Sequence, residues 1–246
     1  MIKSKLSLIN NNKYLLPYLL IISGCVLGYF QVLVTHHNLS IIYKETMFSS
    51  VGNLFLFAAL YVVGKGTYDS YFKNYYFIIR EADFKKVVKN SIKDITLYTL
   101  YFYLIYVLTI LTISFMFSFE GRSIGVHNVY NINLLVYNIY ITIRNGFILT
   151  AIINIVFILK LFDNKYLSLI VLFLNIIFYM ISIFGDTLFN KYKIVIIPQD
   201  YLTNELIYGT FYMDVINTAL VILILFGIVK LIFNYVIKKK RDIIWR

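Results

Sequence analysis

Cysteine and charged residues are scarce in this chain of 246 residues, and each scarcity excludes a class of structure. Cys25 is the single cysteine, so the chain can form neither an intrachain disulfide nor a thiolate metal cluster. Charged residues make up 14% of the chain and apolar residues 60%, which is far from the composition of a soluble domain. The chain is therefore predicted to be an integral membrane protein.

Motifs of membrane enzymes and nucleotide-binding proteins are also missing. The apolar segments contain no paired acids, no H-x-x-x-H and no G-x-S-x-G, so intramembrane catalysis is not expected. The dipeptide Gly64-Lys65 lacks the upstream glycine of a phosphate-binding loop. The segments also lack the embedded acids that carry proton coupling in many transporters. The chain is predicted to be no enzyme by itself, and energy for any transport would come from a separate ATPase.

The formal charge of +11 raises the question of nucleic acid. A nucleic-acid footprint gathers on a soluble domain, whereas here the lysines lie in loops between apolar segments, so membrane topology explains them better. Ile22-Ser23-Gly24-Cys25 resembles a lipoprotein cleavage box, but the chain stays apolar through Val34, which favours an uncleaved span. Gly24 and Gly28 form a G-x-x-x-G that predicts close helix packing within the chain more than a dimer contact.

Apolar runs near the 20 residues that cross hydrocarbon predict an all-α fold with six transmembrane helices. We place them at about 14–35, 48–64, 95–119, 146–162, 166–185 and 215–237, in one domain covering 1–246. His36 and His37 would begin a short outer loop, with poor geometry for joint metal ligation. Eighteen of the 23 basic residues then fall on the cytoplasmic side, so both termini are expected inside a bacterial cytoplasmic membrane.

The segment Tyr71 to Lys93 is the densest cationic stretch and would be cytoplasmic, between the second and third spans. Acids near its start and lysines toward its end suit a short helix. This amphipathic helix would lie across the membrane surface, with Phe77, Phe84 and Val88 on one flank and the lysines on another. Lysines that only fix topology and bind lipid headgroups are an equal alternative to a docking helix for a soluble partner. The residues proposed for docking are Phe77, Arg80, Glu81, Asp83, Phe84, Lys85, Lys86, Val88 and Lys89.

Arg144 decides how the fourth span is drawn. A single helix from Leu134 to Phe162 would be about 43 Å long, more than the hydrocarbon core of about 30 Å, and would carry Arg144 inside it. We therefore expect Leu134 to Ile143 to form a broken or interfacial outer helix, with Arg144 at headgroup level. A buried arginine on a transport pathway is the alternative. Asn154, Asn175 and Asn217, one in each of the last three spans, are expected to form interhelical hydrogen bonds more than to contact a substrate.

This order of spans resembles the permease subunit of a type-two ABC exporter, a class with six spans. The resemblance implies a cytoplasmic coupling helix between spans two and three, at Phe77 to Asn90, and short external helices between spans five and six, at Asp186 to Met213. It also implies pairing with a second permease copy or paralogue. Separate ATPase subunits would bind ATP and Mg and receive Phe84 and neighbouring aliphatic groups, while Arg80, Lys85, Lys86 and Lys89 would contact acidic partner residues.

The resemblance implies export of an amphipathic peptide or another hydrophobic compound out of the cell or membrane. The alternative is a stand-alone membrane protein for immunity or binding, which would sequester a toxin without turnover driven by ATP. An adjacent ATPase gene would favour the first function and its absence the second.

Overall fold

The computed structural model describes residues 15–32, 38–72, 84–118, 130–161, 165–184, 198–203 and 210–244. Within these ranges all regular secondary structure is α-helical, as the composition predicts. The helices are α2 (Leu15–Val32), α3 (Leu39–Phe48), α4 (Ser50–Phe72), α6 (Phe84–Phe117), α7 (Leu134–Leu159), α8 (Lys165–Phe184), α10 (Asp200–Thr203) and α11 (Phe211–Ile244). By length and composition, α4, α6, α7 and α11 can each cross a membrane, and the apolar helix α2 is shorter.

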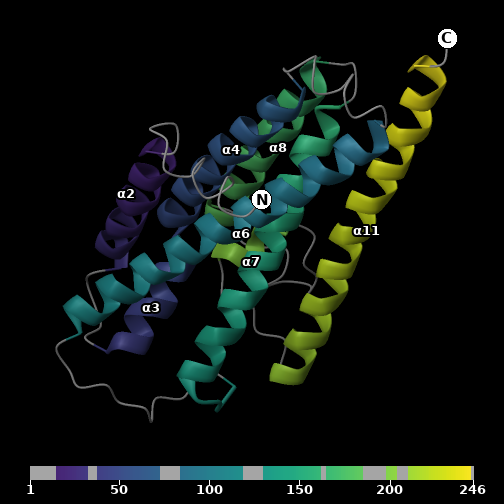
Figure 1. Ribbon diagram of the computed structural model, residues 1–246. Coiled ribbons are helices and arrows are strands. Elements are labelled where there is room, and N and C mark those ends of the chain that lie inside the picture. The colour runs from purple at the N-terminus through teal and green to yellow at the C-terminus, as the bar shows by residue number, and fades with distance from the viewer. Residues whose placement is uncertain are drawn as a thin grey trace.

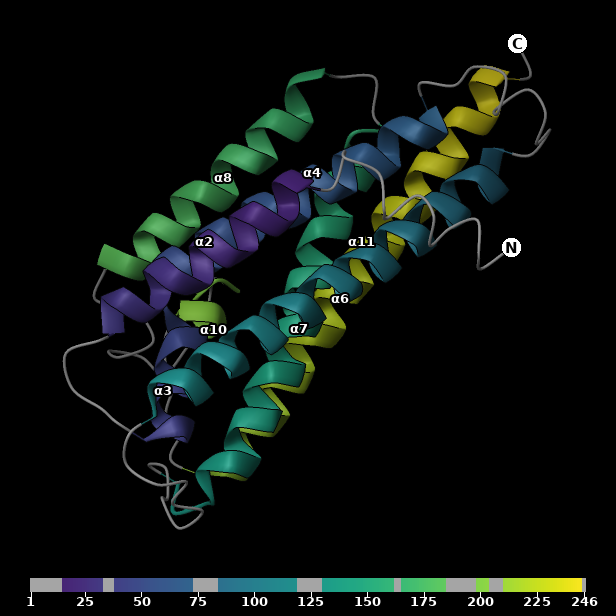
Figure 2. The same ribbon diagram turned by 60° about the vertical axis from the view of Figure 1, so that its left-hand side comes forward.

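The long helices lie side by side, with α2 and α11 at opposite sides of the bundle (Figures 1 and 2). Helices α2 and α4 are antiparallel, because an added Cβ at Gly24 would lie 2.5 Å from the Cβ of Phe55, while one at Gly28 would lie 2.9 Å from Oγ of Ser49. The G-x-x-x-G of α2 therefore packs within the chain, as its sequence predicts.

Contacts along the other helices define their directions. Thr96 and Asn154 lie 2.9 Å apart, and the hydroxyl of Tyr103 donates to the carbonyl of Thr142, so α6 is antiparallel to α7. The hydroxyl of Tyr68, near the end of α4, donates to the carbonyl of Lys160 just beyond α7, which makes α4 and α7 parallel.

Helix α11 also runs parallel to α7. Tyr140 contacts Thr218 near the starts of the two helices, and Ile158 shares a cluster with Val236 near their ends. Helix α8 begins at Lys165, six positions after the last residue of α7 in the sequence. The end of the bundle that holds the start of α6 and the ends of α4, α7 and α11 is called the lysine end below, because Lys85, Lys86, Lys89 and Lys93 are exposed there.

The expected separate coupling helix is wrong for the described residues. From Phe84 the chain continues without a break through the predicted third span to Phe117, as one helix of 34 residues. No glycine or proline interrupts it. Val87, Val88, Ser91, Asp94 and Ile95 are buried at helical spacing, so the first turns pack against the bundle and do not lie across a membrane surface.

The expectation for the fourth span is also wrong. Leu134–Leu159 is one helix of 26 residues, and Arg144 lies buried inside it, not at its outer end. The side chain of Asn133 caps the helix by accepting from the amide of Leu135, so the helix begins twelve residues before the predicted span. At 1.5 Å per residue α7 is about 39 Å long, which tilt accommodates in a bilayer.

A third correction concerns the expected loop between the first two spans. Leu39–Phe48 is the helix α3, capped by the side chain of Asn38, which accepts from the amide of Ser40. Its residues Ile42, Tyr43, Met47 and Phe48 are buried in the core. His36 and His37 lie outside the described residues.

Candidate functional site

Arg144 on α7 is the largest fully buried side chain among the described residues, with 1% of its surface exposed. Its Nη2 donates to the carbonyl of Tyr201 at 2.6 Å, and its Nε donates to Oδ1 of Asn145 at 3.2 Å. Three aromatic rings surround the guanidinium carbon, those of Tyr201 at 5.4 Å, Phe48 at 5.6 Å and Tyr140 at 5.8 Å. The charge is thus enclosed by α3, α7 and α10, in a setting typical of cation–π contacts.

Arg144 supplies a hydrogen-bond donor to the backbone of the buried short helix α10. The last carbonyls of a helix have no partner within it, and in a buried element they must find donors elsewhere. Arg144 donates to Tyr201, and Nδ2 of Asn53 on α4 donates to the carbonyl of Leu202 at 2.8 Å. A cation at the carbonyl end of a helix is also favourable to the helix dipole.

The side chain of Asn175 forms a hydrogen bond at the start of α10. Nε2 of Gln199 donates to Oδ1 of Asn175 on α8 at 2.7 Å, and both residues are buried. The segment 198–203 is therefore held by side chains from α4, α7 and α8. Irregular backbone can lie within the depth of a membrane protein when protein groups satisfy it in this way.

Two buried acids flank this polar cluster. Asp200 on α10 is 5% exposed, and Asp214 on α11 is fully buried. Thr218 links Asp214 to Tyr140, because its hydroxyl donates to Asp214 and pairs with the Tyr140 hydroxyl at 2.8 Å. Within the described residues Arg144 forms no ion pair; two of its nitrogens donate to Asn145 and Tyr201, and the third, Nη1, has no hydrogen-bond partner. Desolvation by burial raises the pKa of Asp200 to about 6.

Some of the predicted docking residues are exposed in the structure, and others are packed against neighbouring helices. Lys85, Lys86 and Lys89 are exposed on the first turns of α6. Val88 is fully buried in a cluster with Ile158, Leu161 and Val236, and the half-buried Phe84 packs against that cluster. The helices α7 and α11 cover Val88, whereas Phe84 keeps part of its surface exposed. The expectation that this apolar flank enters a partner's groove stays a prediction. Phe77, Arg80, Glu81 and Asp83 lie outside the described residues.

The three predicted asparagines occupy different surroundings. Asn154 is buried, and its Nδ2 donates to the Thr96 hydroxyl at 2.9 Å across the α6–α7 contact. Asn175 accepts from Gln199, as described above. Asn217 is half-buried on α11. Two of the three thus join separate elements, which is the structural role weighed above.

Sequence reasoning assigns no site to Asn53, Asp200 or Asp214. One signal was present, since Asn53 interrupts an otherwise apolar segment. In the part of the chain that the structure describes, no three His, Cys, Asp or Glu side chains gather where they could hold a metal ion. Comparisons of the chain with protein-family models, with curated proteins and with solved structures find no match.

Proposed function

We propose that this chain is the membrane-spanning permease subunit of an ATP-driven exporter, with six spans and both termini on the cytoplasmic side. The proposal takes α2, α4, α6, α7, α8 and α11 as the spans. Its main support is that the exposed lysines of α6 lie at the same end of the bundle as the last turns of α11. A cationic end of this kind favours the cytoplasmic side of a membrane.

The length of α6 supports a protrusion at this end. Its 34 residues extend about 51 Å, while the hydrocarbon core is about 30 Å thick. The apolar part from Ile95 to Phe117 is long enough to fill the core by itself. Residues 84–94 then extend about 16 Å into the aqueous phase, with Lys85, Lys86 and Lys89 exposed on them.

In this proposal a separate ATPase binds ATP and Mg and docks on the exposed lysines through acidic side chains. Since Val88 is buried and Phe84 is half-buried against the same cluster, the contact with the partner would be made mainly by charge in this proposal. A second permease copy or paralogue would complete the transporter. The cargo would be an amphipathic peptide or another hydrophobic compound, moved out of the cell or membrane.

The test is to purify the chain from its native membranes in a mild detergent and to measure phosphate release from MgATP in the purified fraction. Hydrolysis should accompany the wild-type chain and be lost with K85E/K86E/K89E. Lys65→Glu, which reverses another exposed lysine on α4, should retain the activity. Unchanged hydrolysis with the triple variant would refute the docking role. A wild-type chain without ATPase would favour the stand-alone immunity or binding protein.

A further inference from the structure

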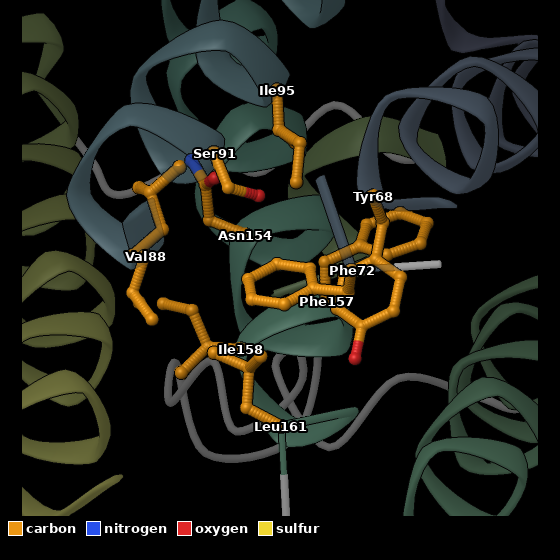
Figure 3. Close-up of a pocket in the computed structure, with 10 residues that line it drawn as sticks. Tyr68, Phe72, Val88, Ser91, Ile95, Asn154, Phe157, Ile158 and Leu161 are labelled. Atoms are coloured by element: carbon orange, nitrogen blue, oxygen red, sulfur yellow. The ribbon is translucent and has the colours of Figure 1, made fainter. Parts of the chain in front are cut away.

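Helices α6 and α11 meet at the lysine end of the bundle, where apolar side chains fill the contact between them. Val88 on α6 and Val236 on α11 belong to one buried cluster with Ile158 and Leu161. In Figure 3 Val88 lies next to Ile158, and the space among the side chains drawn there leaves no room for a water molecule. A ligand that recognises this part of the bundle must therefore bind on its outer surface.

Two exposed lysines, Lys93 and Lys230, adjoin this contact. Ile92 on α6 and Val229 on α11 pack against the same cluster, and each lysine directly follows one of them in the chain. Within the residues that the structure describes, neither lysine forms an ion pair. Their ammonium groups are therefore available to an anion that approaches the two helices from outside.

The position of Lys93 on α6 shows which way it points. Leu111 comes 18 positions after Lys93, and at 3.6 residues per turn this is five whole turns, so the two residues share one flank of the helix. Leu111 and Ile143 of α7 line a common groove. The flank that carries Lys93 therefore borders the side of α7 on which Ile143 lies.

Lys230 on α11 borders the same side of α7. It follows Phe226 by about one turn, and the Phe226 ring contacts the ring of Phe147 on α7, with 6.5 Å between the centroids. Phe147 and Ile143 are one turn apart on α7, and both are exposed. Lys93 and Lys230 thus come from two neighbouring helices and flank one exposed face of the bundle.

On the membrane side of each lysine the exposed surface is apolar. On α6 it continues from Lys93 through Leu97, Leu100 and Leu104, which are all exposed at helical spacing. On α11 it passes Gly227, where an added Cβ would meet nothing within 4 Å, and reaches the exposed Leu223. A molecule that matches this surface has a negative charge at one end and an apolar chain beside it.

We propose that Lys93 and Lys230 bind the phosphate of an anionic phospholipid whose acyl chain lies along Leu97 and Leu100. The apolar part of α6 begins at Ile95, so Lys93 is about 3 Å farther along the axis, at the depth of the lipid headgroups. Hydrogen bonds from an ammonium group to a phosphate are short and strong because both groups are charged. The net charge of the lipid matters, since a zwitterionic headgroup carries its own cation.

The lipid site goes beyond the proposed exporter and does not depend on it. It uses neither of the lysine pairs formed by Lys85, Lys86 and Lys89, on which the ATPase would dock. It requires only that α6 and α11 cross a bilayer, which their length and composition allow. A chain without an associated ATPase would still bind the lipid.

The test is native mass spectrometry of the full chain in a mild detergent, titrated with phosphatidylglycerol or with phosphatidylcholine of the same acyl chains. The wild-type chain should bind phosphatidylglycerol at least tenfold more tightly than phosphatidylcholine. Lys93→Gln and Lys230→Gln should each weaken binding of phosphatidylglycerol about fivefold, and the double variant about thirtyfold, as expected for lysines near an anionic surface. Binding of phosphatidylcholine should not change.

Two other exposed lysines at the same end provide matched controls. Lys65→Gln on α4 and Lys238→Gln on α11 should keep the wild-type affinity for phosphatidylglycerol. A large excess of inorganic phosphate should not displace the lipid, because it lacks the acyl chain. Displacement by phosphate, equal affinity of the wild type for the two lipids, or equal losses in the control variants and in Lys93→Gln and Lys230→Gln would each overturn the proposal.

Discussion

Nη2 of Arg144 donates a hydrogen bond of 2.6 Å to the backbone carbonyl of Tyr201, a residue 57 positions later in the chain. The contact places the positive charge of Arg144 beside α10, a helix of only four residues. Hydrogen bonds from charged groups contribute about 1.5 to 3 kcal/mol each, roughly twice the contribution of neutral ones. The bond therefore links α7 to the segment 198–203 more strongly than a neutral hydrogen bond would.

Arg144→Gln should release α10, because the shorter neutral side chain cannot reach the Tyr201 carbonyl. We expect the thermal midpoint in detergent to fall and the amides of 198–203 to exchange hydrogen at least tenfold faster, about 1.4 kcal/mol. Hydrogen exchange with mass spectrometry measures this. Lys230→Gln, an exposed basic position on α11, serves as the control. Unchanged exchange in 198–203 would show that Arg144 does not hold this segment.

Gly64→Ala should separate α4 from α7. A Cβ at this position would collide with the ring of Phe157, whereas a Cβ at Gly66 meets nothing within 4 Å. Overpacking of this kind costs about 1 to 3 kcal/mol, while alanine in an open helix position gains up to about 1 kcal/mol over glycine. Gly64→Ala should lower the midpoint of thermal unfolding, and Gly66→Ala should maintain or raise it. Equal midpoints would contradict the close contact.

Stability should depend on the proton of Asp200. Burial raises the pKa of this carboxyl from 3.8 to about 6, so the folded chain binds the proton more tightly than the unfolded chain. The resulting stabilisation is complete below about pH 3.8 and is lost as the pH rises through about 6. Asp200→Asn should flatten this part of the curve of thermal midpoint against pH. Identical slopes for Asp200→Asn and wild type would refute the assignment.

The proposed orientation can be tested with single cysteines. Cys25 is fully buried and can be replaced by serine to give a cysteine-free background. Lys86→Cys should react with an impermeant maleimide only after cells are opened, because the lysine end is expected inside. Tyr212→Cys, 74% exposed at the start of α11, should react in intact cells. Labelling of residue 86 from outside would reverse the orientation.

Composition was enough to predict an all-helical membrane protein, because the apolar fraction and the long uncharged segments leave few other folds. The flank of α6 was also predictable, since Phe84 and Val88 follow helical spacing. What covers that flank was not, because Val236 lies 148 positions away from Val88. The position of Arg144 was mispredicted for a similar reason. The free-energy cost of burying a charged arginine can be estimated from the sequence around it. The carbonyl of Tyr201 that accepts its hydrogen bond lies 57 positions later in the chain and could not be foreseen.

The unbroken course of α6 has a mechanical consequence. Helix α6 lacks proline and glycine, the residues that most often kink a helix, over all 34 of its residues, so we expect its two ends to shift together. In the proposed function the ATPase would exert force on the exposed lysines. The last turns of α6 near Phe117, about 50 Å away, would then tilt in the opposite direction. Mechanical work delivered on one side of the membrane would thus reach the other side without any change in secondary structure.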